Sequence, residues 1–377
     1  MTAGTTNRIA VVIPVFNEAG SIEKLLTNIR DKLQSAYRNM DIYVFEDGSS
    51  DGTGDALKRL LASGKIPGLN ISVTPQRKGY PKAARDAIGS IDASKYSHIL
   101  FMDGDGQYPM EDVAHLLQLF EGEYSDHDMI VGRRKTRTEP IYRKFLTGGL
   151  RMIERVLFRP QIKDITSALR IIRTGTAKNI AARVVHSRYN FWLEFTARMS
   201  ALDLKVVEVP VGYLDRTEGE SRVYSLGKIP KIVWAELTAI FLTWMELNFN
   251  KFVKFGIVGS SGALVILSLT WLFTERLHIW YMLSTLIAIE ISIIWAFALN
   301  TVFTFRHDFA DVASAVLALA KYHAVALGGS VINIAVLYVF TEKARVYYLL
   351  SEVIAILVAF GFNYLMSTHH VWQNRRK

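Results

Sequence analysis

Two carboxylates lie two residues apart, directly after an apolar run. Residues 101–109 read Phe-Met-Asp-Gly-Asp-Gly-Gln-Tyr-Pro, so Gly104 separates Asp103 from Asp105. Residues i and i+2 leave a strand on the same face, and glycine lets a ligand approach the backbone closely. Carboxylate oxygens are ligands that Mg²⁺ and Mn²⁺ prefer, often while the ion also holds phosphates. The pattern indicates a site for a cation and a diphosphate, although a lone Asp-x-Asp pair is also typical of an ordinary turn.

Two further polar turns also follow apolar runs. Residues 14–18 read Pro-Val-Phe-Asn-Glu, and residues 46–53 read Glu-Asp-Gly-Ser-Ser-Asp-Gly-Thr. In open α/β sheets, ligands bind in the crevice beyond the carboxyl ends of the strands. Three such turns on one sheet edge favour a nucleotide site over three separate solvated loops.

The elements that must position these turns alternate between strand and helix patterns. The predicted strands are 9–13, 42–45, 71–73, 98–102, 129–131 and 205–209. The predicted helices are 21–33, 55–61, 82–88, 113–120, 145–158, 176–184 and 191–202. Alternation of this kind is typical of an α/β domain with a mostly parallel, Rossmann-like sheet.

The composition is divided unevenly along the 377 residues. Half of the residues are hydrophobic and there is no cysteine, which excludes a disordered chain and a disulfide scaffold. Residues 252–377 carry only 15 charged residues, about 12%, against 21% for the whole chain. The net charge of +9 suits a protein that faces anionic lipid or phosphate, although solubility alone also explains it.

The apolar third contains four candidate membrane spans at 252–273, 281–303, 322–340 and 347–366. Each approaches the roughly 20 residues needed to cross hydrocarbon, and a buried soluble helical bundle is the competing interpretation. The excess of Lys and Arg in alternate connectors predicts a multi-pass protein of the cell membrane with both termini in the cytoplasm. Residues 228–250 predict an amphipathic helix at the membrane surface, or else an ordinary surface helix packed on the first domain.

The four spans also repeat one another. The segments around 254–273 and 321–340 match at an offset of 67 residues, and 297–300 matches 360–363 at an offset of 63. Two copies of one helical hairpin, inserted in the same orientation, explain the pattern.

Residues 9–227 resemble the family 2 glycosyltransferases of the GT-A fold, in particular the polyprenyl-phosphate enzymes typified by dolichyl-phosphate mannose synthase. The matching segments are 14–18, 46–53, 103–109, 164–167 and 216–222. Residues 252–372 resemble the GtrA-like membrane domain with four transmembrane helices. The resemblance implies a GT-A catalytic domain at 1–227, interfacial amphipathic helices at 228–250 and a GtrA-like domain at 251–377.

The resemblance also implies roles for individual residues. The nucleotide-sugar residues around the base and ribose would be Pro14, Phe16, Glu18, Phe45 and Asp47. The cation and the diphosphate would be held by Asp103, Asp105 and Gln107, with Asp103 and Asp105 as the catalytic pair, and Gly104 would belong to the nucleotide-sugar site. Phosphate contacts would come from Arg134, Arg216 and Arg222, and contacts to the acceptor phosphate from Arg143, Arg155 and Ser167.

The expected activity is transfer of a sugar from a nucleotide-diphosphate sugar to dolichyl or polyprenyl phosphate, with inversion and with Mg²⁺ or Mn²⁺ as the cofactor. GDP-mannose and UDP-glucose are the expected donors, with mannose favoured. Membrane lipids are the other expected partners, and no nucleic acid is expected. The sequence leaves open whether the chain forms a homo-oligomer. A non-catalytic glycolipid carrier and a polysaccharide synthase are the alternatives. The synthase is disfavoured because its typical Gln-x-x-Arg-Trp pattern is absent.

Overall fold

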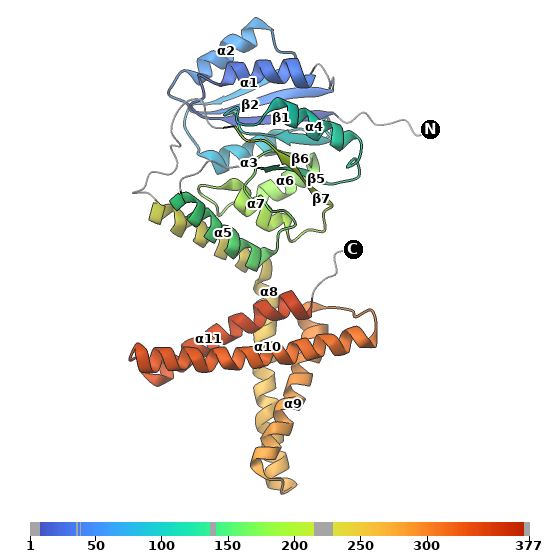
Figure 1. Ribbon diagram of the computed structural model, residues 1–377, viewed down its shortest axis with the longest axis vertical. Helices are drawn as coiled ribbons and strands as arrows, with labels where there is room; N and C mark the ends of the chain where they lie inside the picture. The colour runs from blue at the N-terminus through green and yellow to red at the C-terminus, as the bar shows by residue number, and fades with distance from the viewer. Residues whose placement is uncertain (1–7, 35–36, 38, 136–140, 215–228, 373–377) are drawn as a thin grey trace. The chain divides into compact units, whose positions relative to one another are not determined.

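The chain divides into two compact units, residues 1–247 and residues 248–377 (Figure 1). The computed structural model describes residues 8–34, 37, 39–135, 141–214 and 229–372, with the backbone alone at 141–147. The first unit holds all three polar turns, and the second holds most of the apolar third of the chain.

A seven-stranded sheet with the order β3-β2-β1-β4-β6-β5-β7 forms the centre of the first unit. Its strands are β1 (Ile9–Val15), β2 (Met40–Asp47), β3 (Leu69–Thr74), β4 (His98–Phe101), β5 (Met129–Arg134), β6 (Arg170–Arg173) and β7 (Val206–Val211). All neighbours are parallel except that β6 is antiparallel to both β4 and β5. The predicted mostly parallel α/β fold is confirmed, while β6 was not predicted.

Helices cover both faces of this sheet, with α1 and α2 on one face and α3, α6 and α7 on the other (Figure 1). They are α1 (Ile22–Ile29), α2 (Thr53–Ser63), α3 (Tyr80–Ser90), α4 (Met110–Glu121), α5 (Ile141–Phe158), α6 (Thr174–Arg183) and α7 (Phe191–Met199). Every residue of β1 is buried, as expected for a central strand covered on both faces. The strand ends that carry the polar turns are thus fixed by a rigid core.

Helix α8 runs without a break from Ile229–Trp271, so that its first part belongs to the first unit. There, one face packs on the domain, with Ile232 and Ile240 buried, and the Glu236 carboxylate accepts a backbone hydrogen bond from Asn190. The opposite side leaves Trp234 75% and Phe241 57% exposed, an apolar face that is interrupted by the exposed Lys231 and Thr238. This part of α8 is therefore a packed surface helix, and contact of its exposed apolar face with a membrane stays a prediction.

The second unit continues α8 and adds α9 (Tyr281–Leu299), α10 (Val312–Tyr338) and α11 (Tyr348–Met366). Including their terminal turns, these four helices are long and apolar enough to cross a membrane. The spans predicted from the sequence fall within these helices, except that the fourth begins at Tyr347, one residue before α11, and the four predicted transmembrane helices are thereby confirmed.

The internal repeat has one offset throughout the second unit. The first helices of the two hairpins end in π-helical turns at Leu272–Arg276 and Val339–Lys343, which lie 67 residues apart. His278 and Arg345, again 67 apart, both have a φ of 54°. The second helices end in π-helical turns that begin at Asn300 and Ser367, also 67 apart. The predicted offset of 63 for the second halves was therefore wrong. The similar residues at 297–300 and 360–363 had been aligned about one helical turn away from the true register.

Candidate functional site

The first two polar turns are locked together at the carboxyl ends of β1 and β2. The backbone amide of Asn17 donates to the Ser49 hydroxyl at 2.8 Å, and the Asn17 side chain accepts from the amide of Ser50 at 2.8 Å. The amide of Glu18 donates to the Thr53 hydroxyl at 2.9 Å. Asn17 has a φ of 57°, a conformation that asparagine tolerates better than most residues. These contacts make the two turns one wall of the site.

The third turn comes close to this wall because Gly104 has no side chain. A Cβ at this position would lie 2.4 Å from Val15 Cγ1 and 3.2 Å from the Pro14 carbonyl oxygen. Asp103 and Asp105, on either side of Gly104, are both half-buried. The structure thus brings the predicted carboxylate pair beside the end of β1.

Asp103 accepts a hydrogen bond that the sequence did not predict. The Tyr80 hydroxyl donates to Asp103 Oδ1 at 2.7 Å, and the Trp192 indole N–H donates to the Tyr80 oxygen at 2.9 Å. Burial and the negative charge of Asp103 raise the pKa of Tyr80, so the hydroxyl keeps its proton. No spacing signal pointed to either residue, because they are 112 positions apart and meet only in the fold.

The Gln107 side chain is held at both of its polar atoms. Its Nε2 donates to the Leu214 carbonyl at 2.8 Å, and its Oε1 accepts from the Tyr213 hydroxyl at 2.8 Å. The Gln107 backbone amide donates to Asp105 Oδ1 at 3.2 Å. The end of β7 therefore fixes Gln107, whose oxygen retains one lone pair for a ligand.

The donor set fits a cation that is shared with a substrate. Among the described residues, no group of three or more His, Cys, Asp or Glu side chains is placed to hold a metal ion. Two half-buried carboxylates and one amide oxygen lie together at a single turn. Mg²⁺ and similar ions commonly use one or two carboxylates, several waters and substrate phosphates. The residues at this turn fit an ion of this kind.

Asp47 is buried, and both of its carboxylate oxygens accept hydrogen bonds from backbone amides. Its Oδ1 accepts from the amide of Lys78 at 2.7 Å, and its Oδ2 from the amide of Gly79 at 2.9 Å. These bonds fix the turn that leads directly into α3 and Tyr80. Contact of Asp47 with a ribose or base stays a prediction, since its hydrogen bonds here are to the protein.

The other residues predicted to hold the base and ribose gather on the same strand ends. Pro14 is buried, whereas Phe16, Glu18 and Phe45 are half-buried. The Arg77 guanidinium lies 3.8 Å from the centre of the Phe16 ring, a cation–π contact that the sequence did not predict. Flat, half-buried side chains of this kind are suited to stacking against a base.

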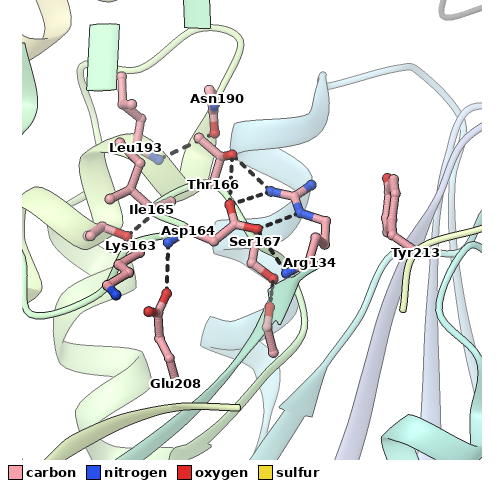
Figure 2. Close-up of polar contacts among 12 residues, drawn as sticks. Arg134, Lys163, Asp164, Ile165, Thr166, Ser167, Asn190, Leu193, Glu208 and Tyr213 are labelled. Carbon is pink, nitrogen blue, oxygen red and sulfur yellow. Dashed lines mark hydrogen bonds and ion pairs between the residues drawn. The ribbon is translucent and has the colours of Figure 1, made fainter. Parts of the chain in front are cut away.

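Arg134 forms a buried ion pair with Asp164 (Figure 2). Its Nε and Nη2 atoms each lie 2.7 Å from a different Asp164 oxygen, and Nη2 also donates to Thr166. Burial alone would lower the pKa of Arg134, but the hydrogen bonds and charge of Asp164 hold it above its ordinary value. The predicted phosphate contact from Arg134 must use Nη1 or break this pair.

Ser167 is buried beside the pair of Arg134 and Asp164 (Figure 2). Its side chain is fully buried, and its hydroxyl donates to the Gly132 carbonyl at 2.5 Å. Behind it, the fully buried Arg170 donates to the carbonyls of Ser167 and Ile165. The structure does not support the predicted contact of Ser167 with an acceptor phosphate, because its hydroxyl joins β5 to the 164–167 turn.

The remaining predicted arginines are less well defined. Arg155 is exposed on α5 and donates to the Lys163 carbonyl at 3.4 Å. Arg143 lies where the structure describes the backbone of α5 alone, and Arg216 and Arg222 lie outside the described residues. Their phosphate contacts stay predictions.

Comparison with known proteins identifies two regions. Residues 10–181 match the Glycosyl transferase family 2, and residues 254–372 match the GtrA/DPMS transmembrane domain. The dolichol-phosphate mannosyltransferase of Pyrococcus furiosus is 29% identical over 381 residues, covering 97% of this chain and 99% of that protein. The undecaprenyl-phosphate mannosyltransferase of Micrococcus luteus is 27% identical over 222 residues, covering 57% of this chain and 87% of that protein. The predicted resemblance is confirmed in both regions.

Among solved structures, a mannosyltransferase from Pyrobaculum calidifontis in complex with GDP-Man and Mn²⁺ aligns with 95% of this chain and 87% of its own, with a TM-score of 0.41 and 16% identity.

Proposed function

This chain joins a family 2 glycosyltransferase domain to a GtrA/DPMS transmembrane domain, and from that premise we propose that it transfers a sugar, with mannose favoured, from a nucleotide-diphosphate sugar to a polyprenyl phosphate. One observation carries the proposal: three polar turns meet at one sheet edge, in a chain that also carries four membrane-spanning helices. A nucleotide site and a membrane anchor in one chain suit the transfer of a sugar from a water-soluble donor to a lipid acceptor.

Donor binding falls to residues at the carboxyl ends of β1, β2 and β4. The wall formed by 14–18 and 46–53 would receive the base and ribose, with Phe16 and Phe45 as its aromatic surfaces. Asp103, Asp105 and the Gln107 oxygen would hold Mg²⁺ or Mn²⁺. A bound cation would neutralise charge that develops on the departing diphosphate. Arg134, Arg216 and Arg222 would supply further positive charge to the phosphates.

The acceptor needs little help with deprotonation. A phosphate monoester has a second pKa near ~6, so a lipid monophosphate is largely dianionic at neutral pH. A phosphate oxygen would attack the anomeric carbon as the bond from that carbon to the diphosphate breaks. One such displacement inverts configuration, giving a β-linked product from an α-linked donor. Asp103 accepts a hydrogen bond from Tyr80, so we assign it an orienting role and not that of an essential base.

We further propose that the catalytic domain and both termini face the cytoplasm. Lys251, Lys254 and Arg306 would lie on the same side as the basic C-terminal residues 375–377. Arg276, Lys343 and Arg345 would lie on the other side, and the larger cluster of Lys and Arg marks the cytoplasmic face.

A screen of donors and acceptors tests the function. The full-length protein in detergent is incubated with GDP-mannose or UDP-glucose, a short polyprenyl phosphate, and Mg²⁺ or Mn²⁺. We expect an organic-soluble sugar phosphate from one donor, lost on addition of EDTA and in the Asp105→Asn variant. Absence of a lipid-linked product from any common donor, in a protein that binds the nucleotide, would show that the function is wrong.

A further inference from the structure

A two-step hydrogen-bond chain reaches Asp103 from the interior of the first unit. The Trp192 indole nitrogen lies 2.9 Å from the Tyr80 oxygen, which lies 2.7 Å from Asp103 Oδ1. Trp192 lies in the first turn of α7, Tyr80 begins α3, and Asp103 follows β4. The chain of hydrogen bonds therefore links α7, through Tyr80 of α3, to the carboxylate that follows β4.

The chemistry of these groups fixes the direction of the chain. An indole N–H only donates, so the Tyr80 oxygen must act as the acceptor in its contact with Trp192. The single hydroxyl proton of Tyr80 is then left for Asp103, whose Oδ1 must accept it. This bond sets the orientation of the Asp103 side chain, as a cation ligand requires.

The packing prevents the first member of the chain from moving. Trp192 is 2% exposed, its ring lies edge-on to Phe101 at 4.8 Å, and the Arg170 guanidinium lies 4.4 Å from its centre. The second member is fixed from the other side, because Asp47 binds both amides of the turn that precedes Tyr80. The hydroxyl is therefore delivered to Asp103 by a rigid support.

We propose that Tyr80 is a positioning residue for the cation site, and that Trp192 sets the direction of its hydroxyl toward Asp103. The proposal deepens the proposed function, because it assumes that Asp103 helps to hold the cation and diphosphate. It extends the site beyond the polar turns to two aromatic residues from the helical layer.

Three full-length variants test this. Tyr80→Phe removes only the hydroxyl, Trp192→Phe removes the indole N–H, and Tyr43→Phe is the matched control. Tyr43 also makes one hydroxyl contact, to the Tyr96 hydroxyl at 2.9 Å, away from Asp103. Mn²⁺ binding is followed by electron paramagnetic resonance in the presence of GDP or UDP, whichever the unmodified chain binds more tightly. The thermal unfolding midpoint, and the rate of sugar transfer at several Mn²⁺ concentrations, are measured for the same variants and for the unmodified chain.

We expect Tyr80→Phe to weaken Mn²⁺ binding by about tenfold, since loss of a hydrogen-bond partner that orients a metal ligand typically costs about 10–100-fold in metal affinity. Trp192→Phe should weaken it in the same direction, and Tyr43→Phe should leave it unchanged. Excess Mn²⁺ should restore much of the transfer rate of Tyr80→Phe, which a merely structural defect would not allow.

Equal Mn²⁺ affinity in Tyr80→Phe and Tyr43→Phe would overturn the proposal. So would weaker binding in Tyr80→Phe that comes with a larger loss of thermal stability than the control shows. If the unmodified chain binds Mn²⁺ and nucleotide but makes no lipid-linked sugar, the proposed function fails while the positioning role is still measured.

Discussion

The buried pair of Arg134 and Asp164 gives the sharpest prediction about stability. Asp164→Asn keeps the shape of the side chain but removes its charge, leaving the guanidinium buried and unpaired. The two side chains are 7% and 9% exposed and are joined by a contact of 2.7 Å. Breaking such a pair costs about 3–5 kcal/mol. For a unit of this size, 1 kcal/mol shifts the unfolding midpoint by about 2–4 °C, so we expect a fall of at least about 6 °C.

The assay is thermal unfolding of the full-length protein in detergent, followed by tryptophan fluorescence. Asp126→Asn is the matched control, because Asp126 pairs with Lys205 at 2.8 Å while both side chains are more than 60% exposed (62% and 65%). Exposed pairs contribute about 1 kcal/mol or less. If Asp164→Asn lowers the midpoint no more than Asp126→Asn does, the reasoning about the buried pair is incorrect.

A double substitution separates the structural role of the pair from its chemical role. Replacing Arg134 with Met and Asp164 with Leu removes both charges, and apolar residues of similar volume often replace a buried pair without loss of stability. We expect the double variant to recover most of the midpoint lost in Asp164→Asn while remaining inactive in sugar transfer. Recovery of activity would show that the Arg134 charge is not needed by the substrate.

Three further predictions follow from single side chains. Glu154 is fully buried without a hydrogen-bond partner among the described residues, and burial raises its pKa above the ordinary 4.5. As the pH rises, Glu154 ionises in the unfolded chain but not in the folded one, which stabilises the unfolded chain. Glu154→Gln should therefore raise the free energy of unfolding and the unfolding midpoint at about pH 8, and the gain in free energy should shrink by up to ~1.4 kcal/mol per pH unit toward about pH 5. A gain that does not depend on pH contradicts this prediction. Ser167→Ala should cost about 1 kcal/mol in unfolding free energy and leave the KM for the lipid acceptor unchanged, because the hydroxyl bonds only within the protein; a raised acceptor KM restores the predicted contact. Gly104→Ala should abolish nucleotide binding, measured by calorimetry, because its Cβ would lie 2.4 Å from Val15 Cγ1; unchanged affinity shows that the turns do not need this approach.

The sequence predicted the parts of the fold that depend on local pattern. The buried run at 9–13 and the polar turn at 103–109 lie where the alternation of strands and helices indicated. Strand β6 was missed because it has four residues, Arg170–Arg173, of which two are charged and only two are aliphatic. Its pairing with β4 and β5 comes from the sheet, and no local signal distinguishes it from a loop.

The sequence indicated the residues proposed as ligands, but not the residues that support them. Asp103 and Asp105 are recognisable because they follow a strand, whereas the contact between Tyr80 and Trp192 depends on how α3 meets α7. Ser167 shows a different limit, since a resemblance gives a residue's position in a motif but not its burial. Side-chain direction and partner choice arise from packing, which periodicity does not encode.

The central claim is a cation-dependent transfer of sugar to a lipid phosphate at the turn containing Asp103 and Asp105. The most direct measurement is the initial rate of formation of lipid-linked mannose from GDP-mannose by the full-length protein, compared with Asp105→Asn and with Asp126→Asn. We expect the unmodified chain and Asp126→Asn to form the product at similar rates with Mn²⁺, and Asp105→Asn to lose at least about 100-fold, as when one electrostatic contact to the transition state is removed. Equal rates in Asp105→Asn and the unmodified chain would contradict the account.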